Sequence, residues 1–224
     1  YEPSPGDVKS VAAADLVFIN ALGLEGWIEK LITSSGSKGE VVRVSDSSEY
    51  IKNDPHAWQN LTNGKIYVKN IRDALVKIDK IHADEYQKNA EIYIKKLDEL
   101  EIWVRAEISK IPLQKRTVVT THDAFKYFSK AYGINFVSPV GISTAAQASA
   151  ADMAKLLDQI RSQKITSVFL ENNGNERLIK QLAKDAGVHV GGTLYPDFLS
   201  DKNGPAATYI EMFRHNVREL AGGK

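Results

Sequence analysis

The chain contains no cysteine among its 224 residues. This absence excludes a disulfide framework, a thiolate zinc site and a cysteine nucleophile. It does not define the compartment, because a cysteine-free chain suits an oxidising and a reducing environment equally. Three enzyme motifs are absent as well: there is no H-E-x-x-H, no G-x-S-x-G and no Walker phosphate loop.

The chain also lacks an excess of charge of either sign. Its 29 Lys and Arg residues stand against 28 Asp and Glu residues, so no long-range field would attract nucleic acid or an anionic membrane. We therefore expect no nucleic-acid partner. Hydrophobic residues make up 43% and charged residues 25% of the chain, which are ordinary values for a folded globular protein.

Long apolar runs are missing too. No run approaches the roughly 18 apolar residues that are needed to span a bilayer. The opening Tyr1-Glu2-Pro3-Ser4-Pro5 has neither the basic start nor the apolar stretch of a signal peptide. We expect this sequence to start inside a longer precursor that carries the signal peptide.

Hydrophobic periodicity predicts an α/β protein. A continuous apolar run at Leu16–Ile19 and a β-branched run at Val41–Val44 indicate strands, with an amphipathic helix between them and a short helix before them. From Leu61 to about Ile111 the pattern is helical, with a break near Ala83-Asp84. Strands and helices then alternate: strands at 117–120, 136–137, 168–170 and 188–190, and helices at 124–132, 150–163, 175–186 and 205–220. This order predicts two lobes of parallel sheet flanked by helices and joined by a helix.

Polar residues that follow the predicted strands are candidates for a ligand site, because ligands of parallel sheets bind beyond the carboxyl ends of strands. His122 follows one such strand and precedes a helix. Glu171 follows another and can act as a helix-dipole partner, a hydrogen-bond acceptor for a ligand residue, or a ligand; we favour the supporting roles. A single histidine at a strand end is more often structural than functional, so position alone does not decide the role of His122.

Two further candidates lie in loops that proline stiffens. His56 is flanked by Pro55 and Trp58, which restrict and seat its loop; the alternative is a turn whose histidine points to solvent. Asp197 follows Pro196 and can equally be an ordinary turn aspartate. His82, His189 and His215 look unremarkable, the last because its helical neighbours indicate a solvated face.

At these residues the chain resembles the zinc and manganese solute-binding proteins of ABC importers. The segments that carry the resemblance occur in the family's order: Tyr1-Glu2-Pro3-Ser4-Pro5, Ala14-Asp15-Leu16-Val17-Phe18, Gly23-Leu24-Glu25-Gly26-Trp27, Asp54-Pro55-His56-Ala57-Trp58, Thr121-His122-Asp123-Ala124-Phe125 and Asp197-Phe198. The resemblance covers the chain nearly end to end.

The resemblance implies a C-clamp: an N-terminal lobe (residues 1–83), one long rigid linking helix (84–111) and a C-terminal lobe (112–224). It also implies a metal site between the lobes, with His56, His122 and Asp197 as ligands; from its position after a predicted strand, Glu171 remains our candidate for a supporting residue. A further ligand, a histidine, would lie just upstream of Tyr1 with the opening strand of the first lobe. Zinc-type relatives often carry a histidine-rich loop where this chain is short, between Val44 and Asp54.

The implied function is capture of one zinc or manganese ion and its delivery to an ABC permease, by a monomer that is periplasmic or lipid-anchored outside the cytoplasmic membrane. Histidine at position 122 favours zinc, whereas the carboxylate of Asp197 also accepts manganese. The protein would not be an enzyme. Two alternatives remain open from the residues: a zinc-dependent metallohydrolase, which would need a general base such as Glu171 or Asp123, and a surface adhesin using the same fold.

Overall fold

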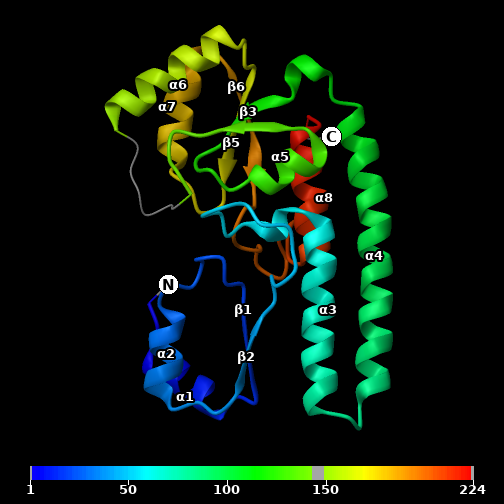
Figure 1. Ribbon diagram of the computed structural model, residues 1–224. Helices are drawn as coiled ribbons and strands as arrows, with labels where there is room; N and C mark the ends of the chain where they lie inside the picture. Colours follow the sequence, from blue (N-terminus) through cyan, green and yellow to red (C-terminus); the bar gives the residue numbers. More distant parts are fainter. Residues whose placement is uncertain (1, 143–148, 223–224) are drawn as a thin grey trace. The chain divides into compact units, whose positions relative to one another are not determined.

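The computed structural model describes residues 2–142 and 149–222, and it comprises two compact units, Tyr1–Leu97 and Asp98–Lys224 (Figure 1). Tyr1 of the first motif lies outside the described residues. Helix α4 (Ala83–Ser109) begins in the first unit and ends in the second. In the part of the chain that is described, none of the helices combines the length and the apolar character needed to cross a bilayer.

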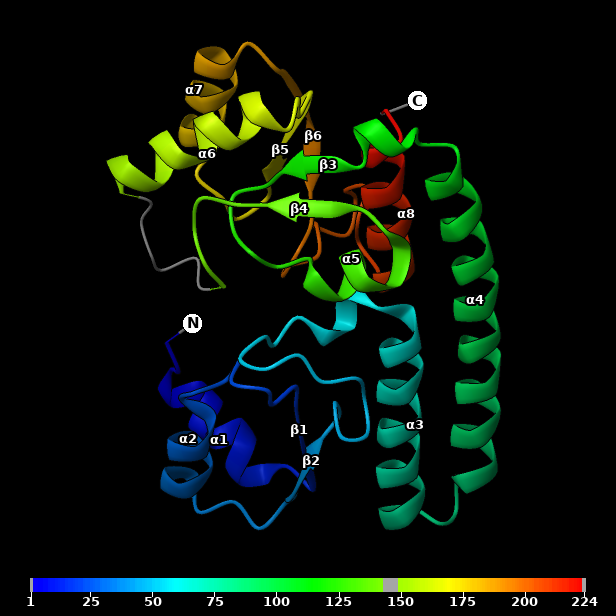
Figure 2. The same cartoon turned by 45° about the horizontal axis from the view of Figure 1, so that its top comes forward.

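The first unit is built on a parallel pair of strands. Its elements before α4 are α1 (Pro5–Ala13), β1 (Leu16–Ile19), α2 (Ile28–Ser35), β2 (Glu40–Arg43), the short 3-10 helix η1 (Ala57–Gln59) and α3 (Leu61–Ile78). Leu16 lies opposite Glu40, and Ile19 lies opposite Arg43. Helices α1 and α2 lie on one side of this pair and α3 lies on the other (Figures 1 and 2). The two predicted strands and the helices around them are therefore confirmed.

Local capping explains where the helices of this unit begin. Ser4 and Asp7 form a reciprocal capping box at the start of α1, and Pro5 occupies its first turn. Asn60 accepts a hydrogen bond from the Thr62 backbone amide and so caps α3. The predicted linking helix corresponds to α4, whose 27 residues include neither proline nor glycine. The predicted lobe boundaries at residues 83 and 111 stay predictions.

The second unit contains a four-stranded parallel sheet of order β4-β3-β5-β6. After α4 its elements are the 3-10 helix η2 (Leu113–Lys115), β3 (Thr117–Val119), α5 (Lys126–Tyr132), β4 (Asn135–Val137), α6 (Ala150–Ser162), β5 (Ser167–Glu171), α7 (Glu176–Ala186), β6 (His189–Leu194) and α8 (Tyr209–Leu220). Both views place α6 and α7 on one face of the sheet and α5 and α8 on the other (Figures 1 and 2). The predicted fold, two parallel sheets flanked by helices, is confirmed.

The core of the second unit lies between this sheet and its helices. Buried Val119 and Val168 of the sheet pack with Leu156, Ile160 and Ile179 of α6 and α7. Because all four strands are parallel, the residues that follow β3, β5 and β6 emerge at the same edge of the sheet. These are the segments that carry His122, Glu171 and Asp197.

Two predicted boundaries are wrong. Strand β6 continues to Leu194 rather than ending at residue 190, because a Cβ on Gly191 would come within 2.4 Å of the Phe169 ring and glycine removes that clash. Helix α8 begins at Tyr209 rather than residue 205, because the Thr208 side chain accepts a hydrogen bond from the Glu211 amide and sets the cap there.

Candidate metal centre

His122 lies beyond the carboxyl end of β3, in a segment that is buried throughout. The exposed fraction is at most 6% for each of Thr120, Thr121 and His122, and it is 1% for His122 itself. The hydroxyl of Thr120 donates to the backbone carbonyl of His122 over 3.2 Å. The β3 end therefore fixes the backbone that carries this histidine.

Glu171, the last residue of β5, orients His122. Its Oε1 accepts hydrogen bonds from the backbone amides of Thr121 at 2.9 Å and His122 at 3.2 Å. Its Oε2 lies 2.6 Å from Nδ1 of the His122 ring, which donates to it because a carboxylate only accepts. One buried carboxylate thus holds both the backbone and the ring of His122.

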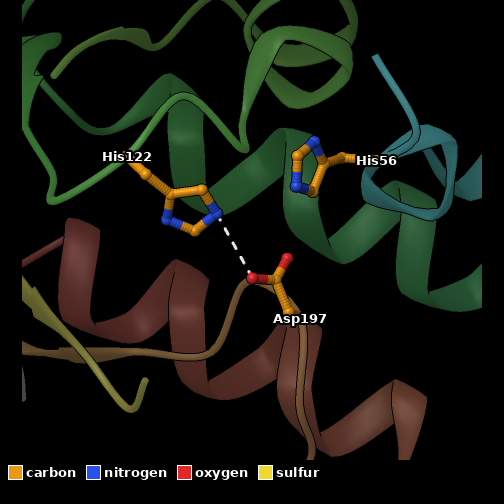
Figure 3. A group of neighbouring side chains, drawn as sticks. All are labelled: His56, His122 and Asp197. Atoms are coloured by element: carbon orange, nitrogen blue, oxygen red, sulfur yellow. Dashed lines mark ion pairs between the residues drawn. The ribbon is translucent and has the colours of Figure 1, made fainter. Parts of the chain in front are cut away.

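Asp197, three residues beyond β6, meets the other nitrogen of the same ring. Its Oδ2 lies 3.2 Å from Nε2 of His122 (Figure 3). The same oxygen accepts a hydrogen bond from Nδ2 of Asn173 at 2.9 Å. The second unit therefore brings together three of the four predicted residues, His122, Glu171 and Asp197.

The two carboxylates change the protonation of His122. Burial opposes its charged form, but hydrogen bonds from the ring to Asp197 and Glu171, together with their negative charges, outweigh burial and raise the pKa of His122 to about 10. This raised pKa favours the imidazolium form of His122, between its two carboxylates, in the metal-free protein at neutral pH. A metal ion that binds Nε2 must displace that proton.

His56 has a comparable but more local setting in the first unit. It is 3% exposed, and Asp54 Oδ1 accepts hydrogen bonds from its backbone amide at 3.0 Å and from its ring Nδ1 at 2.7 Å. The Trp58 ring packs edge-on against it, with the ring centroids 5.3 Å apart. The alternative of a solvent-pointing histidine is wrong, because Asp54 and Trp58 hold it inside.

The loop that carries His56 is tied to the rest of the first unit. The side chain of Asn20, just after β1, donates to the carbonyl of Pro55 over 2.9 Å, and the hydroxyl of Tyr67 on α3 donates to Asn20 Oδ1 over 2.6 Å. Asn20, which Tyr67 of α3 holds in turn, therefore ties the loop to the end of β1.

Of the remaining histidines, one departs from expectation. His82, between α3 and α4, is exposed and contacts Asp79, and His189 is an exposed residue at the start of β6. His215, however, does not lie on a solvated face: it is half-buried, and its Nε2 lies 2.8 Å from the Thr193 carbonyl.

Sequence reasoning missed the roles of Asp54 and Asn173. Asp54 lies two residues before His56 in the Asp-Pro-His-Ala-Trp motif. An aspartate at that spacing can accept hydrogen bonds from both the backbone amide and the ring of the histidine. Asn173 lies in a polar turn, where asparagine is expected for local reasons, so no pattern distinguished it.

Residues 1–223 match the family model described as zinc-uptake complex component A, periplasmic. The chain belongs to this family. Among its relatives, the manganese-binding lipoprotein MntA of Halalkalibacterium halodurans is 34% identical over 229 aligned positions, which cover 100% of this chain and 76% of the relative. The iron-binding protein YfeA of Yersinia pestis is 36% identical over 231 positions, with 100% and 74% covered.

A solved structure agrees with these relatives. The periplasmic zinc-binding protein TroA of Treponema pallidum superposes with a TM-score of 0.92 at 30% sequence identity, and the alignment covers 100% of this chain and 85% of TroA. The fold and the family are therefore established by independent comparisons.

Family membership settles several predictions. The family consists of transporter components rather than enzymes, which confirms that this protein is not an enzyme and disfavours the metallohydrolase. The adhesin alternative is not favoured either. Periplasmic and lipoprotein relatives confirm a location outside the cytoplasmic membrane.

Proposed function

We propose that this protein captures one divalent transition-metal ion and delivers it to the membrane permease of an ABC importer. The observation that carries the proposal is the group of buried His122, buried Glu171 and half-buried Asp197, which presents an imidazole and a carboxylate side by side at one sheet edge. Its relatives are named for binding manganese, iron and zinc. Imidazole and carboxylate are suitable ligands for these ions.

The proposed ligands are His56 of the first unit and His122 and Asp197 of the second, as the family resemblance implies; Figure 3 labels these three side chains. In both histidines a carboxylate holds Nδ1, and this hydrogen bond selects Nε2 as the ligand atom. Asp54 and Glu171 would thus act as supporting acceptors.

Zinc is the preferred ion in this proposal. Two imidazoles favour zinc, and the Irving–Williams order places zinc well above manganese for the same set of ligands. The carboxylate of Asp197 keeps manganese within the site's range, so geometry and metal supply would also contribute to selection. We expect the protein to work as a monomer with one ion per chain.

The proposal is tested by thermal unfolding of the full-length protein after chelator treatment, with Zn²⁺, Mn²⁺, Mg²⁺ or Ca²⁺ added. An ion at 100 times its dissociation constant stabilises by about 2.7 kcal/mol, which raises the melting temperature by several degrees. We expect this shift with Zn²⁺ and Mn²⁺ but not with Mg²⁺ or Ca²⁺.

A matched pair of variants makes the test specific. Asp197→Ala should remove most of the shift, whereas Asp201→Ala, an exposed aspartate four residues further along, should keep it. Equal shifts in both variants would contradict Asp197 as a ligand. No shift with any transition metal in the wild-type protein would contradict metal capture itself.

A further inference from the structure

The turn Glu171-Asn172-Asn173-Gly174, which begins at the last residue of β5, contacts both segments of the second unit that carry proposed ligands. Glu171 holds His122, as described above. Asn172 Nδ2 donates to the backbone carbonyl of Phe198 at 3.1 Å, and Asn173 Nδ2 donates to Asp197 Oδ2 at 2.9 Å. A single turn therefore contacts the imidazole on one side and the carboxylate on the other.

The position of this turn is itself fixed by close packing. A Cβ on Gly174 would come within 2.5 Å of Thr121 Oγ1, so the turn can lie this close to the His122 segment only with glycine there. The backbone amide of Asn172 also donates to the carbonyl of Leu194, the last residue of β6. Asn173 is consequently held in place on both sides.

The segment that carries Asp197 is anchored independently of this turn. Buried Asn216 of α8 accepts from the Tyr195 amide and donates to the Tyr195 carbonyl, each over 2.9 Å. The backbone before Asp197 is thus fixed, and the remaining freedom of the carboxylate is rotation of its own side chain. The Asn173 hydrogen bond restricts that rotation.

The identity of the donor atom follows from chemistry. An ionised carboxylate only accepts hydrogen bonds, so the Asn173 amide must present its nitrogen to Asp197. An oxygen that accepts from an amide is less available to a metal ion, because one of its lone pairs is already used. Asp197 would then bind through one oxygen more readily than through two.

We propose that Asn173 is a positioning residue that limits Asp197 to one-oxygen coordination and thereby favours zinc over manganese. This inference rests on the proposed metal site. Zinc is satisfied by four ligands with imidazole among them, whereas manganese prefers higher coordination by oxygen, which a two-oxygen carboxylate would help to supply.

The test compares Asn173→Leu, which keeps the approximate size of the side chain but donates no hydrogen bond, with the wild-type protein. Asn173→Ala serves as a second variant in case leucine disturbs the turn. Asn172→Ala is the matched control, because it removes a hydrogen bond from the same turn to the same loop without touching the carboxylate. Dissociation constants for Zn²⁺ and Mn²⁺ are measured on each full-length protein by competition with a chelator of known affinity.

Loss of a group that orients a ligand typically lowers metal affinity about 10- to 100-fold. We expect Asn173→Leu and Asn173→Ala to lose zinc affinity in this range while manganese affinity changes little, so that the zinc-to-manganese ratio falls about tenfold or more. Asn172→Ala should lower both affinities by the same factor. The visible absorption of bound Co²⁺ should weaken in the Asn173 variants, as coordination rises above four.

Two results would overturn the inference while leaving the proposed function intact: an unchanged zinc-to-manganese ratio in both Asn173 variants, or the same fall of the ratio in Asn172→Ala. A wild-type protein that binds neither ion would instead reject the proposed function, and the inference with it.

Discussion

The two histidines of the proposed site are fixed in different ways. His56 is oriented by Asp54, two residues away in the sequence, within one proline-stiffened loop. His122 is oriented by Glu171 and meets Asp197, which are 49 and 75 residues away and come from different strand ends. The first arrangement is local, whereas the second exists only after the sheet of the second unit has formed.

This difference has an electrostatic consequence. His122 lies between two carboxylates, and they raise its pKa to about 10. The raised pKa therefore favours a proton on Nε2 of His122, the atom that we propose binds the metal ion. We expect His56 to be a preoriented ligand. At His122, between Glu171 and Asp197, we expect metal binding to require release of a proton.

Replacing either histidine should have the largest effect on metal binding. We expect His56→Ala and His122→Ala each to lower zinc affinity about 1,000-fold, or by about 4 kcal/mol, because each removes a ligand. His122→Ala should also destabilise the metal-free protein, by about 3 kcal/mol, and more than His56→Ala does, because it leaves two carboxylates, Glu171 and Asp197, without their cation, whereas His56→Ala affects Asp54 alone. Competition titrations and urea unfolding measure the two effects, and equal destabilisation by both variants would contradict the contrast.

Replacing the carboxylates that support the histidines should lower zinc affinity by a smaller factor than replacing the histidines does. Glu171→Gln should lower zinc affinity by up to about 100-fold, because Glu171 accepts three hydrogen bonds around His122. Asp54→Asn should cost closer to 10-fold, because the amide oxygen can still accept from the His56 backbone. The same competition titrations measure both values, and the reverse order would show that local orientation matters more.

The two histidines should also differ in whether zinc binding releases a proton from them. Below pH 10 the displaced His122 proton makes zinc affinity fall by about tenfold for each unit of decreasing pH. Calorimetry at pH 7.5 in buffers of different ionisation enthalpy should report close to one proton released per ion. His56→Gln should keep this release; its absence in the wild-type protein would contradict the proton-loaded cluster.

The smallest expected effect is on the stability of the metal-free protein. Because the folded-state pKa of His122 is raised above its unfolded value, its stabilising contribution is complete below about pH 6.5 and is lost as pH rises toward 10. We expect the free energy of unfolding to fall by about 1 kcal/mol between pH 7 and pH 8. Urea titrations check this, with Glu171→Gln as the variant that should flatten the dependence; a rise in stability over this interval would count against it.

Much of the fold could be predicted from the sequence because its elements are strongly periodic. The apolar run Leu16–Ile19 became β1 with the same bounds, and Pro112 ended the helical stretch that contains α4. The errors arose where tertiary contacts overrode local preference. Strand β6 runs through Gly191, which the neighbouring Phe169 ring requires, and His215 lies within hydrogen-bond distance of a strand carbonyl although its sequence neighbours are polar.

Only part of the site could be predicted from the sequence. His122, Glu171 and Asp197 could be proposed because each follows a predicted strand or a proline-stiffened turn. The role of Asn173 could not, since it depends on the register of β5 and β6, which places Glu171 opposite Leu194 after an irregularity between Val168 and Leu170. No pattern in the sequence specifies such a shift in register.

Anomalous diffraction at the zinc edge, from crystals of the zinc-loaded full-length protein, would show whether His56, His122 and Asp197 bind one ion together. We expect one strong anomalous peak about 2.0–2.2 Å from Nε2 of both histidines and from an Asp197 oxygen. A peak that lies beyond bonding distance of any of these three residues would contradict the account.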